Sequence, residues 1–186
     1  PSVTATAGVA FRSYSPTANA FRYFPRLETI KAGNTSWQWE AVPNVARSLN
    51  FRLTVRDNRA GGATNNSDDM LVTVNGTAGP FVVNSLNTSV TLTAGATETI
   101  TWDVAGTTAN GVNAANVDIL MSTDGGDTYP VTLASGVTND GSHDITVPNS
   151  VGSQNRIMVK GTNHIFFDIS NANFTISNPL PCTASV

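Results

Sequence analysis

Three aspartates, Asp57, Asp68 and Asp69, are the side chains of this sequence whose type and spacing come nearest to a metal site. They stand at the two ends of a stretch that is rich in Gly and Asn. Calcium takes several carboxylate and carbonyl oxygens from a protein, so the three aspartates are our calcium candidates. The alternative is that they form turns, because Asp and Asn side chains bond to the nearby backbone. No loop of evenly spaced aspartates is present.

Motifs for catalysis are missing from the sequence. It contains no His-Glu-x-x-His helix, no Gly-x-Ser-x-Gly turn, no phosphate-binding loop and no dinucleotide fingerprint. Its two histidines, His143 and His164, have no Cys partner and lie outside any zinc motif. We therefore expect no catalytic residue and no resident cofactor in this chain.

Aromatic side chains gather between residues 11 and 39 and include Tyr14, Tyr23, Trp37 and Trp39. Exposed, coplanar rings form platforms on which sugars stack, so these four residues are our candidates for a binding site. Packing in a core or between modules is the alternative, because large aromatic side chains tend to be buried. Whether the rings share one exposed surface decides between the two interpretations.

The elements that must position these residues are predicted to be β-strands. Apolar and polar residues alternate with a period of two, in short runs that end at Gly, Asn or Pro turn signals. About seven such runs in roughly a hundred residues are what an immunoglobulin-like or fibronectin-III-like sandwich requires. No segment shows a sustained helical period. The predicted core residues are Ile100, Trp102, Val104, Val117, Ile119, Met121, Ile145, Val147, Ile157, Val159, Phe174 and Ile176.

One turn in the second half of the chain has a recognisable pattern. Ser122-x-Asp124-x-Gly126-x-Thr128-Tyr129 matches the Asp-box, Ser-x-Asp-x-Gly-x-Thr-aromatic. In such a turn the aspartate accepts backbone N–H bonds and the glycines adopt positive φ. We therefore predict a hairpin that joins two antiparallel strands, and we assign it no reactive role.

The chain divides into two modules by strand content. Residues 1–79 supply three or four strands, including the run from Leu49 to Arg56 and its predicted antiparallel partner from Met70 to Val74. That is too few to close a sandwich, so we predict a partial β-sandwich-like module that lacks its first strands. Residues 80–178 form the predicted complete sandwich. Residues 179–186 are predicted to be a linker, which holds the single cysteine, Cys182, so a disulfide framework is excluded.

Composition excludes some partners and favours an extracellular location. The net charge is −3 and the pI is about 5.2, which gives no support for nucleic-acid binding, and no run is long and apolar enough to span a membrane. Residues 1–79 carry eight basic and five acidic side chains, against two and eight in residues 80–186. A surface rich in Thr, Asn, Ser and Gly is typical of extracellular β proteins. The first residue, Pro1, leads us to expect a piece of a longer protein.

Several segments resemble a region of secreted, reprolysin-like zinc metallopeptidases of Bacteroidetes-type bacteria, the region that follows the catalytic domain. These segments are residues 11–16, 22–30, 48–58 and 67–74, and residues 97–107 and 165–175 resemble the β-sandwich module that comes next. The resemblance implies a non-catalytic accessory region that acts as a spacer and as a docking platform for a protein or glycan substrate. It implies that the parent's catalytic domain is a partner and that zinc belongs to that domain. A carbohydrate-binding module or an adhesin repeat are the alternatives.

Overall fold

The computed structural model describes residues 1–179, and the chain divides into two compact units. The first unit comprises Pro1–Arg26 and Thr35–Gly76, and the second comprises Leu27–Asn34 and the chain from Thr77 onward. The segment Leu27–Asn34 falls within the predicted first module but packs with the second unit. The predicted linker, with Cys182, lies outside the described residues apart from Pro179.

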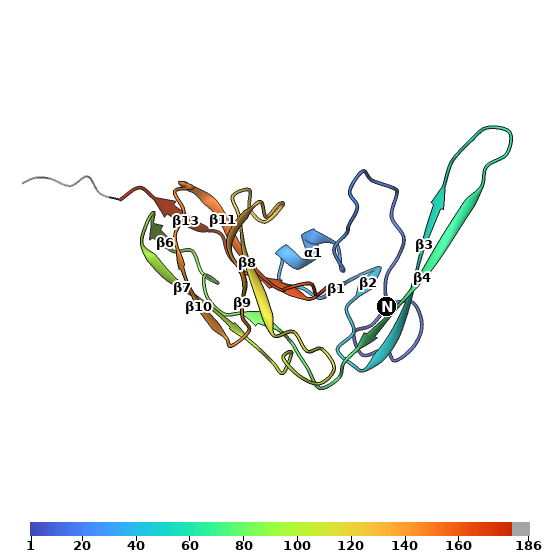
Figure 1. Cartoon of the computed structure of the whole chain (residues 1–186), viewed down its shortest axis with the longest axis horizontal. Coiled ribbons are helices and arrows are strands. Elements are labelled where there is room, and N and C mark those ends of the chain that lie inside the picture. Colours follow the sequence, from blue (N-terminus) through green and yellow to red (C-terminus); the bar gives the residue numbers. More distant parts are fainter. Residues whose placement is uncertain (180–186) are drawn as a thin grey trace, which may run out of the picture. The chain divides into compact units, whose positions relative to one another are not determined.

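The second unit is a sandwich of two β-sheets (Figure 1). One sheet has the strand order β10-β7-β5, formed by β5 (Val82–Val83), β7 (Thr97–Asp103) and β10 (Ser142–Thr146). The other has the order β6-β13-β11-β8-β9, formed by β6 (Thr91–Thr93), β8 (Asn116–Ser122), β9 (Val131–Thr138), β11 (Gly152–Gly161) and β13 (Phe174–Ser177). A short strand, β12 (Phe167–Ile169), also pairs with β11. Neighbouring strands are antiparallel except β6 and β13, which run parallel.

The core between the two sheets confirms the predicted β-sandwich. Successive side chains of a strand point to opposite faces, so each alternating run sends one apolar row inward. Eleven of the twelve predicted core residues are buried in one cluster, and the twelfth, Val104, packs against it. Each fully buried large side chain contributes about 1.5–3 kcal/mol through the hydrophobic effect. The contributions of all these side chains together hold the two sheets against each other.

The indole of Trp102 lies in this core and belongs to a buried polar network. Its Nε1–H donates to Oδ1 of Asn139 at 2.8 Å. The amide of Asn139 donates in turn to Oγ1 of Thr107 at 3.0 Å and to the carbonyl of Ala114 at 2.9 Å. Asn139 is only 3% exposed. The network gives each of these buried polar groups a hydrogen-bond partner. A buried donor without a partner would destabilise this end of the core.

A short helix, α1 (Leu27–Lys31), is an element that the sequence pattern did not predict. Five residues are too few to show a helical period. The helix ends in a Schellman turn, with Gly33 at φ 72° and the N–H of Asn34 bonded to the carbonyl of Thr29 at 3.0 Å. Within the second unit, Nη1 of Arg156 donates to the carbonyl of Lys31 at 3.1 Å. Nζ of Lys31 lies 2.5 Å from Oδ1 of Asp127.

The Asp-box forms the predicted turn between β8 and β9. Oδ1 of Asp124 accepts the backbone N–H groups of Asp127 and Thr128 at 3.0 and 2.9 Å. The hydroxyls of Ser122 and Thr128 donate to the same carboxylate at 2.7 and 2.6 Å. These hydrogen bonds, led by the one from Ser122, hold the pKa of Asp124 far below its usual value. The carboxylate acts as the centre of the turn.

We expect Asp124→Ala to lower the unfolding free energy of the second unit at pH 7, because the variant loses the hydrogen bonds to the carboxylate. The loss should be only about 1 kcal/mol, because solvent screens an exposed carboxylate. A depressed native pKa stabilises the fold above the unfolded pKa of about 4 and loses that effect as the pH falls through the native pKa. The difference between wild type and variant should therefore shrink from pH 4 toward pH 2. Hydrogen exchange of the β8 and β11 amides reports the second unit and measures it. An unchanged difference at low pH would contradict the assignment.

Within the described residues, the first unit contains two small sheets. One is a hairpin of β1 (Ser36–Trp37) and β2 (Glu40–Ala41), and the other is a long hairpin of β3 (Arg47–Arg56) and β4 (Asn65–Val74) (Figure 1). The pairing of β3 with β4 confirms the predicted antiparallel partners, with Leu49 opposite Val72. Leu49 is buried, but Leu53 on the same face is 68% exposed. The apolar row of this hairpin is therefore covered only near its base.

Candidate binding site

The β1–β2 hairpin places two tryptophans and a glutamate within four residues of each other. Trp37 pairs with Glu40 across the hairpin, and Trp39 lies in the turn between them. The extended segments before α1 contribute three arginines, one tyrosine and one phenylalanine to the same region of the first unit. The resulting site consists of Arg12, Tyr14, Arg22, Phe24, Arg26, Trp37, Trp39 and Glu40, and we call it the arginine–aromatic cluster.

Glu40 is the centre of the arginine–aromatic cluster. Its side chain is 0% exposed and forms an ion pair with Nη2 of Arg22. Its Oε2 accepts the backbone N–H of Arg26 at 2.9 Å and the indole N–H of Trp37 at 3.1 Å. A buried carboxylate is tolerated only when it is paired and hydrogen-bonded. Glu40 therefore fixes Arg22, Trp37 and the backbone at Arg26.

Guanidinium groups and aromatic rings stack on one another around Glu40. Cζ of Arg12 lies 5.5 Å from the centroid of the Tyr14 ring and 5.8 Å from that of Trp39. Cζ of Arg22 lies 4.5 Å from the Tyr14 centroid, and Cζ of Arg26 lies 3.7 Å from the centroid of Trp37. These distances are those of cation–π contacts. Three guanidinium groups thus lie against the aromatic rings of the cluster.

Tyr14 links the exposed part of the cluster to its buried part. Burial and the nearby Glu40 carboxylate raise the pKa of Tyr14, while Arg22 and Arg26 oppose the rise. The ring is held in place by the guanidinium group of Arg22, which lies 4.5 Å from its centroid. The Tyr14 residue is nevertheless 44% exposed, and Trp39 is 47% exposed. These two rings form the accessible face of the cluster.

Arg12 is exposed between those two rings. Its Nε donates to the carbonyl of Ser13 at 3.2 Å. Its Nη1 and Nη2 groups bond to none of the residues that the structure describes. An arginine in this position offers a planar pair of donors that matches a carboxylate or phosphate. Chemically, the arrangement suits recognition of an anion.

The structure brings together three of the four predicted aromatic candidates. Tyr14, Trp37 and Trp39 belong to the cluster, whereas Tyr23 packs edge-on against Phe21, with 5.7 Å between ring centroids. Burial raises the pKa of Tyr23. The arginines and Glu40 were missed by reasoning from the sequence. One signal was available, because Glu40 is the only acidic residue between positions 29 and 56 and directly follows the two tryptophans.

The three calcium candidates are not gathered in one place. Asp68 and Asp69 are consecutive residues of β4 and point to opposite faces of the hairpin. Asp69 pairs with Arg52 through two hydrogen bonds of 2.6 and 2.7 Å, which lower its pKa. Asp57 accepts the N–H groups of Arg59 and Thr64, both at 3.2 Å, and closes the hairpin tip. Within residues 1–179, no three acidic, His or Cys side chains gather as a metal site.

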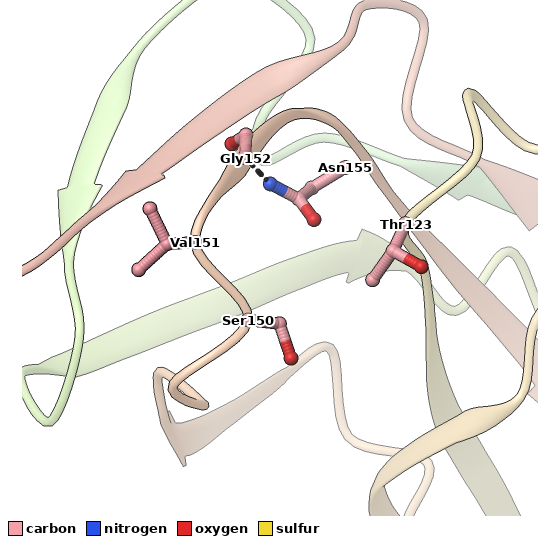
Figure 2. Close-up of a pocket in the computed structure, with 5 residues that line it drawn as sticks. All are labelled: Thr123, Ser150, Val151, Gly152 and Asn155. Carbon is pink, nitrogen blue, oxygen red and sulfur yellow. Dashed lines mark hydrogen bonds between the residues drawn. The ribbon is translucent and has the colours of Figure 1, made fainter.

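The second unit has a pocket of about 300 Å³ with an uncharged lining (Figure 2). Its lining residues are Thr123, Ser150, Val151, Gly152 and Asn155. Nδ2 of Asn155 donates to the carbonyl of Gly152 at 2.7 Å and to that of Phe174 at 3.3 Å, where β11 bulges against β13. Asn155 therefore compensates for a break in the ladder of hydrogen bonds, and the pocket offers no titratable group.

Comparison with known proteins identifies the second unit. The family model of the Kre9/KNH-like N-terminal Ig-like domain matches residues 83–176, just over half of the chain. No curated protein sequence matches the chain. In the described residues, no helix is long and apolar enough to cross a membrane. The match covers both sheets of the sandwich and its Asp-box turn. The chain therefore belongs to the family of Kre9/KNH-like N-terminal Ig-like domains.

Proposed function

We propose that this chain is a non-catalytic accessory region of a secreted, reprolysin-like zinc metallopeptidase, in which it acts as a spacer and a docking platform. The resemblance of segments from both units to that region supports the parent enzyme. A composition rich in Thr, Asn, Ser and Gly supports an extracellular location. The packed core of the Ig-like sandwich supports the spacer role, because such a core keeps its ends at a fixed separation.

The observation that carries the docking role is the exposed face of the arginine–aromatic cluster. Tyr14, Trp39 and Arg12 are residue types that dominate binding energy in protein interfaces. They are held in place by neighbours that the chain itself supplies, so little conformational entropy is lost when a partner binds. A surface of this kind suits contact with a protein substrate.

A platform for stacking neutral sugars is less well supported by the same geometry. Sugar rings stack on the open faces of aromatic side chains. Guanidinium groups already lie over the rings of Tyr14 and Trp37, at 4.5 and 3.7 Å from their centroids. Only Trp39 combines high exposure with a single, more distant guanidinium neighbour. The cluster therefore favours a protein partner over a carbohydrate-binding module.

The parent enzyme is tested by the gene sequence upstream of Pro1, where we expect a zincin domain with a His-Glu-x-x-His motif. The chain alone, assayed with zinc on casein, should release no peptides. Deletion of the chain from the parent enzyme should slow the cleavage of a large protein and leave the cleavage of a short peptide unchanged. Zinc-dependent cleavage by the isolated chain would refute the proposal. Tandem copies of this region in place of a zincin domain would indicate an adhesin instead.

A further inference from the structure

Arg12 and the two rings beside it form a site with a definable ligand. We infer that Arg12, Tyr14 and Trp39 bind a carboxylate of an acidic polypeptide segment, an inference that rests on the docking role proposed above. The ligand would lie against the two half-exposed rings and place its carboxylate on the guanidinium group of Arg12. Nothing in the family match concerns this site, since the match begins at residue 83.

The hydrogen-bonding capacity of Arg12 supports a carboxylate as the ligand. The Nε–H is used by the carbonyl of Ser13, and the Nη groups bond to none of the described residues. These groups form a planar fork whose geometry matches the two oxygens of a carboxylate. Arg22 differs in this respect, because its Nη1 donates to the carbonyl of Arg12 at 2.8 Å and its Nη2 is paired with Glu40.

The site is organised before any ligand binds. The bond from Arg22 to the Arg12 carbonyl fixes the backbone at Arg12. The ring of Tyr14 packs against the guanidinium group of Arg22, 4.5 Å from its centroid, and Trp39 lies in the tight turn of the β1–β2 hairpin. The guanidinium group of Arg12 is held against both rings. A ligand therefore meets a donor group that already lies between two rings, so less side-chain entropy is lost on binding.

The charge around the site also favours an anion. The carboxylate nearest to Arg12 in the cluster, Glu40, is buried and already paired with Arg22. Residues 1–79 carry eight basic and five acidic side chains, so the wider charge of this part of the chain is positive as well. An acidic ligand is attracted over a distance of about 8 Å at physiological ionic strength.

A polypeptide fits the site better than an acidic sugar. Guanidinium groups lie over the ring of Tyr14 at 5.5 and 4.5 Å, where a sugar ring would have to stack. The edge of the Tyr14 ring and the partly exposed indole of Trp39 remain open to a ligand. The methylene groups of Glu and Asp side chains pack well on such surfaces. The carboxylate is common to both ligand classes, so the experiment compares them directly.

The test is titration of the full chain, at low salt, with three probes followed by NMR. The probes are hexaglutamate, its uncharged match hexaglutamine, and oligogalacturonate. We expect hexaglutamate to bind, with shifts centred on Arg12, Tyr14 and Trp39, and hexaglutamine not to bind. Arg12→Gln should weaken hexaglutamate binding about tenfold, as expected for loss of a charge-assisted hydrogen bond. Arg12→Lys should also weaken it, because lysine lacks the planar fork.

Arg59→Gln is the matched control, because it removes one positive charge from the exposed tip of the β3–β4 hairpin. We expect this variant to change the affinity less than about twofold, by screened electrostatics alone. Equal effects of Arg12→Gln and Arg59→Gln would overturn the inference, and so would tighter binding of oligogalacturonate. If Arg12→Gln fails to fold, the shifts of the wild-type chain decide, and shifts away from the cluster would refute the site. If the chain does not bind hexaglutamate, this inference is refuted. The proposed function still stands in that case if the gene encodes a zincin domain upstream.

Discussion

Replacement of Glu40 by alanine should lower the unfolding free energy of the first unit by about 3–5 kcal/mol. The side chain is fully buried and accepts bonds from Arg22, the backbone of Arg26 and the indole of Trp37. Alanine would leave the guanidinium group of Arg22 without its counter-charge and the two N–H groups without an acceptor. Breaking a buried pair by removing one partner is among the most destabilising changes that a single substitution makes.

The effect can be measured on the first unit alone. The chain has three tryptophans, and a Trp102→Phe background leaves only Trp37 and Trp39 as fluorescent reporters. Urea unfolding in this background should show a lower midpoint for Glu40→Ala. The matched variant Glu40→Gln keeps the volume and one carbonyl acceptor, so its loss should be about half as large. A midpoint for Glu40→Ala equal to that of the background would show that Glu40 does not organise the cluster.

The second large effect is expected at Asn139 in the sandwich. Asn139→Ala should lower the unfolding free energy of the second unit by about 3 kcal/mol, because it leaves two buried groups unpaired. These groups are the indole N–H of Trp102 and the carbonyl of Ala114, whereas the hydroxyl of Thr107 keeps its bond to the carbonyl of Val104 at 2.6 Å. Removing the acceptor also frees the end of the Trp102 ring, so its packing in the core should loosen.

Hydrogen exchange separates this effect from a general loss of turn structure. The indole N–H of Trp102 should exchange slowly in the wild type and much faster in Asn139→Ala. Asn149 is a suitable control, since it is exposed and its side chain has no hydrogen bond within the described residues. Asn149→Ala should change stability by no more than about 0.5 kcal/mol. Continued protection of the indole N–H in Asn139→Ala would contradict the network.

The sandwich could be predicted from the sequence because its signal is local. A residue such as Ile100 or Ile119 lies in a strand whose alternation is visible over a few positions. Asn139 shows where this reasoning ends. Its neighbours Asp140 and Gly141 mark a turn, and the sequence predicts no more than that. Its burial depends on Trp102, 37 positions away in the chain, and on how the two sheets meet.

The candidate site was predictable by residue type but not by arrangement. Tyr14, Trp37 and Trp39 could be named as candidates because large rings are rare and conspicuous. Their stacking partners could not, because Arg22 and Glu40 are 18 positions apart and meet only in the folded unit. The calcium candidates Asp68 and Asp69 were predicted to lie in a loop. The strand β4 begins at Asn65 instead, since cross-strand pairs such as Arg52 with Asp69 extend the hairpin without any apolar signal.

The attachment of α1 to the second unit sets an order of events during synthesis of the chain. The segment Leu27–Asn34 is made before the rest of the second unit, and Arg156, which donates to the carbonyl of Lys31, lies 125 positions after that residue. At typical translation rates this separation corresponds to roughly 6–25 s. Throughout that interval the ribosome has not yet produced the β11 residues against which the helix rests. The second unit is therefore completed only when a segment made earlier, Leu27–Asn34, meets strands that are made much later.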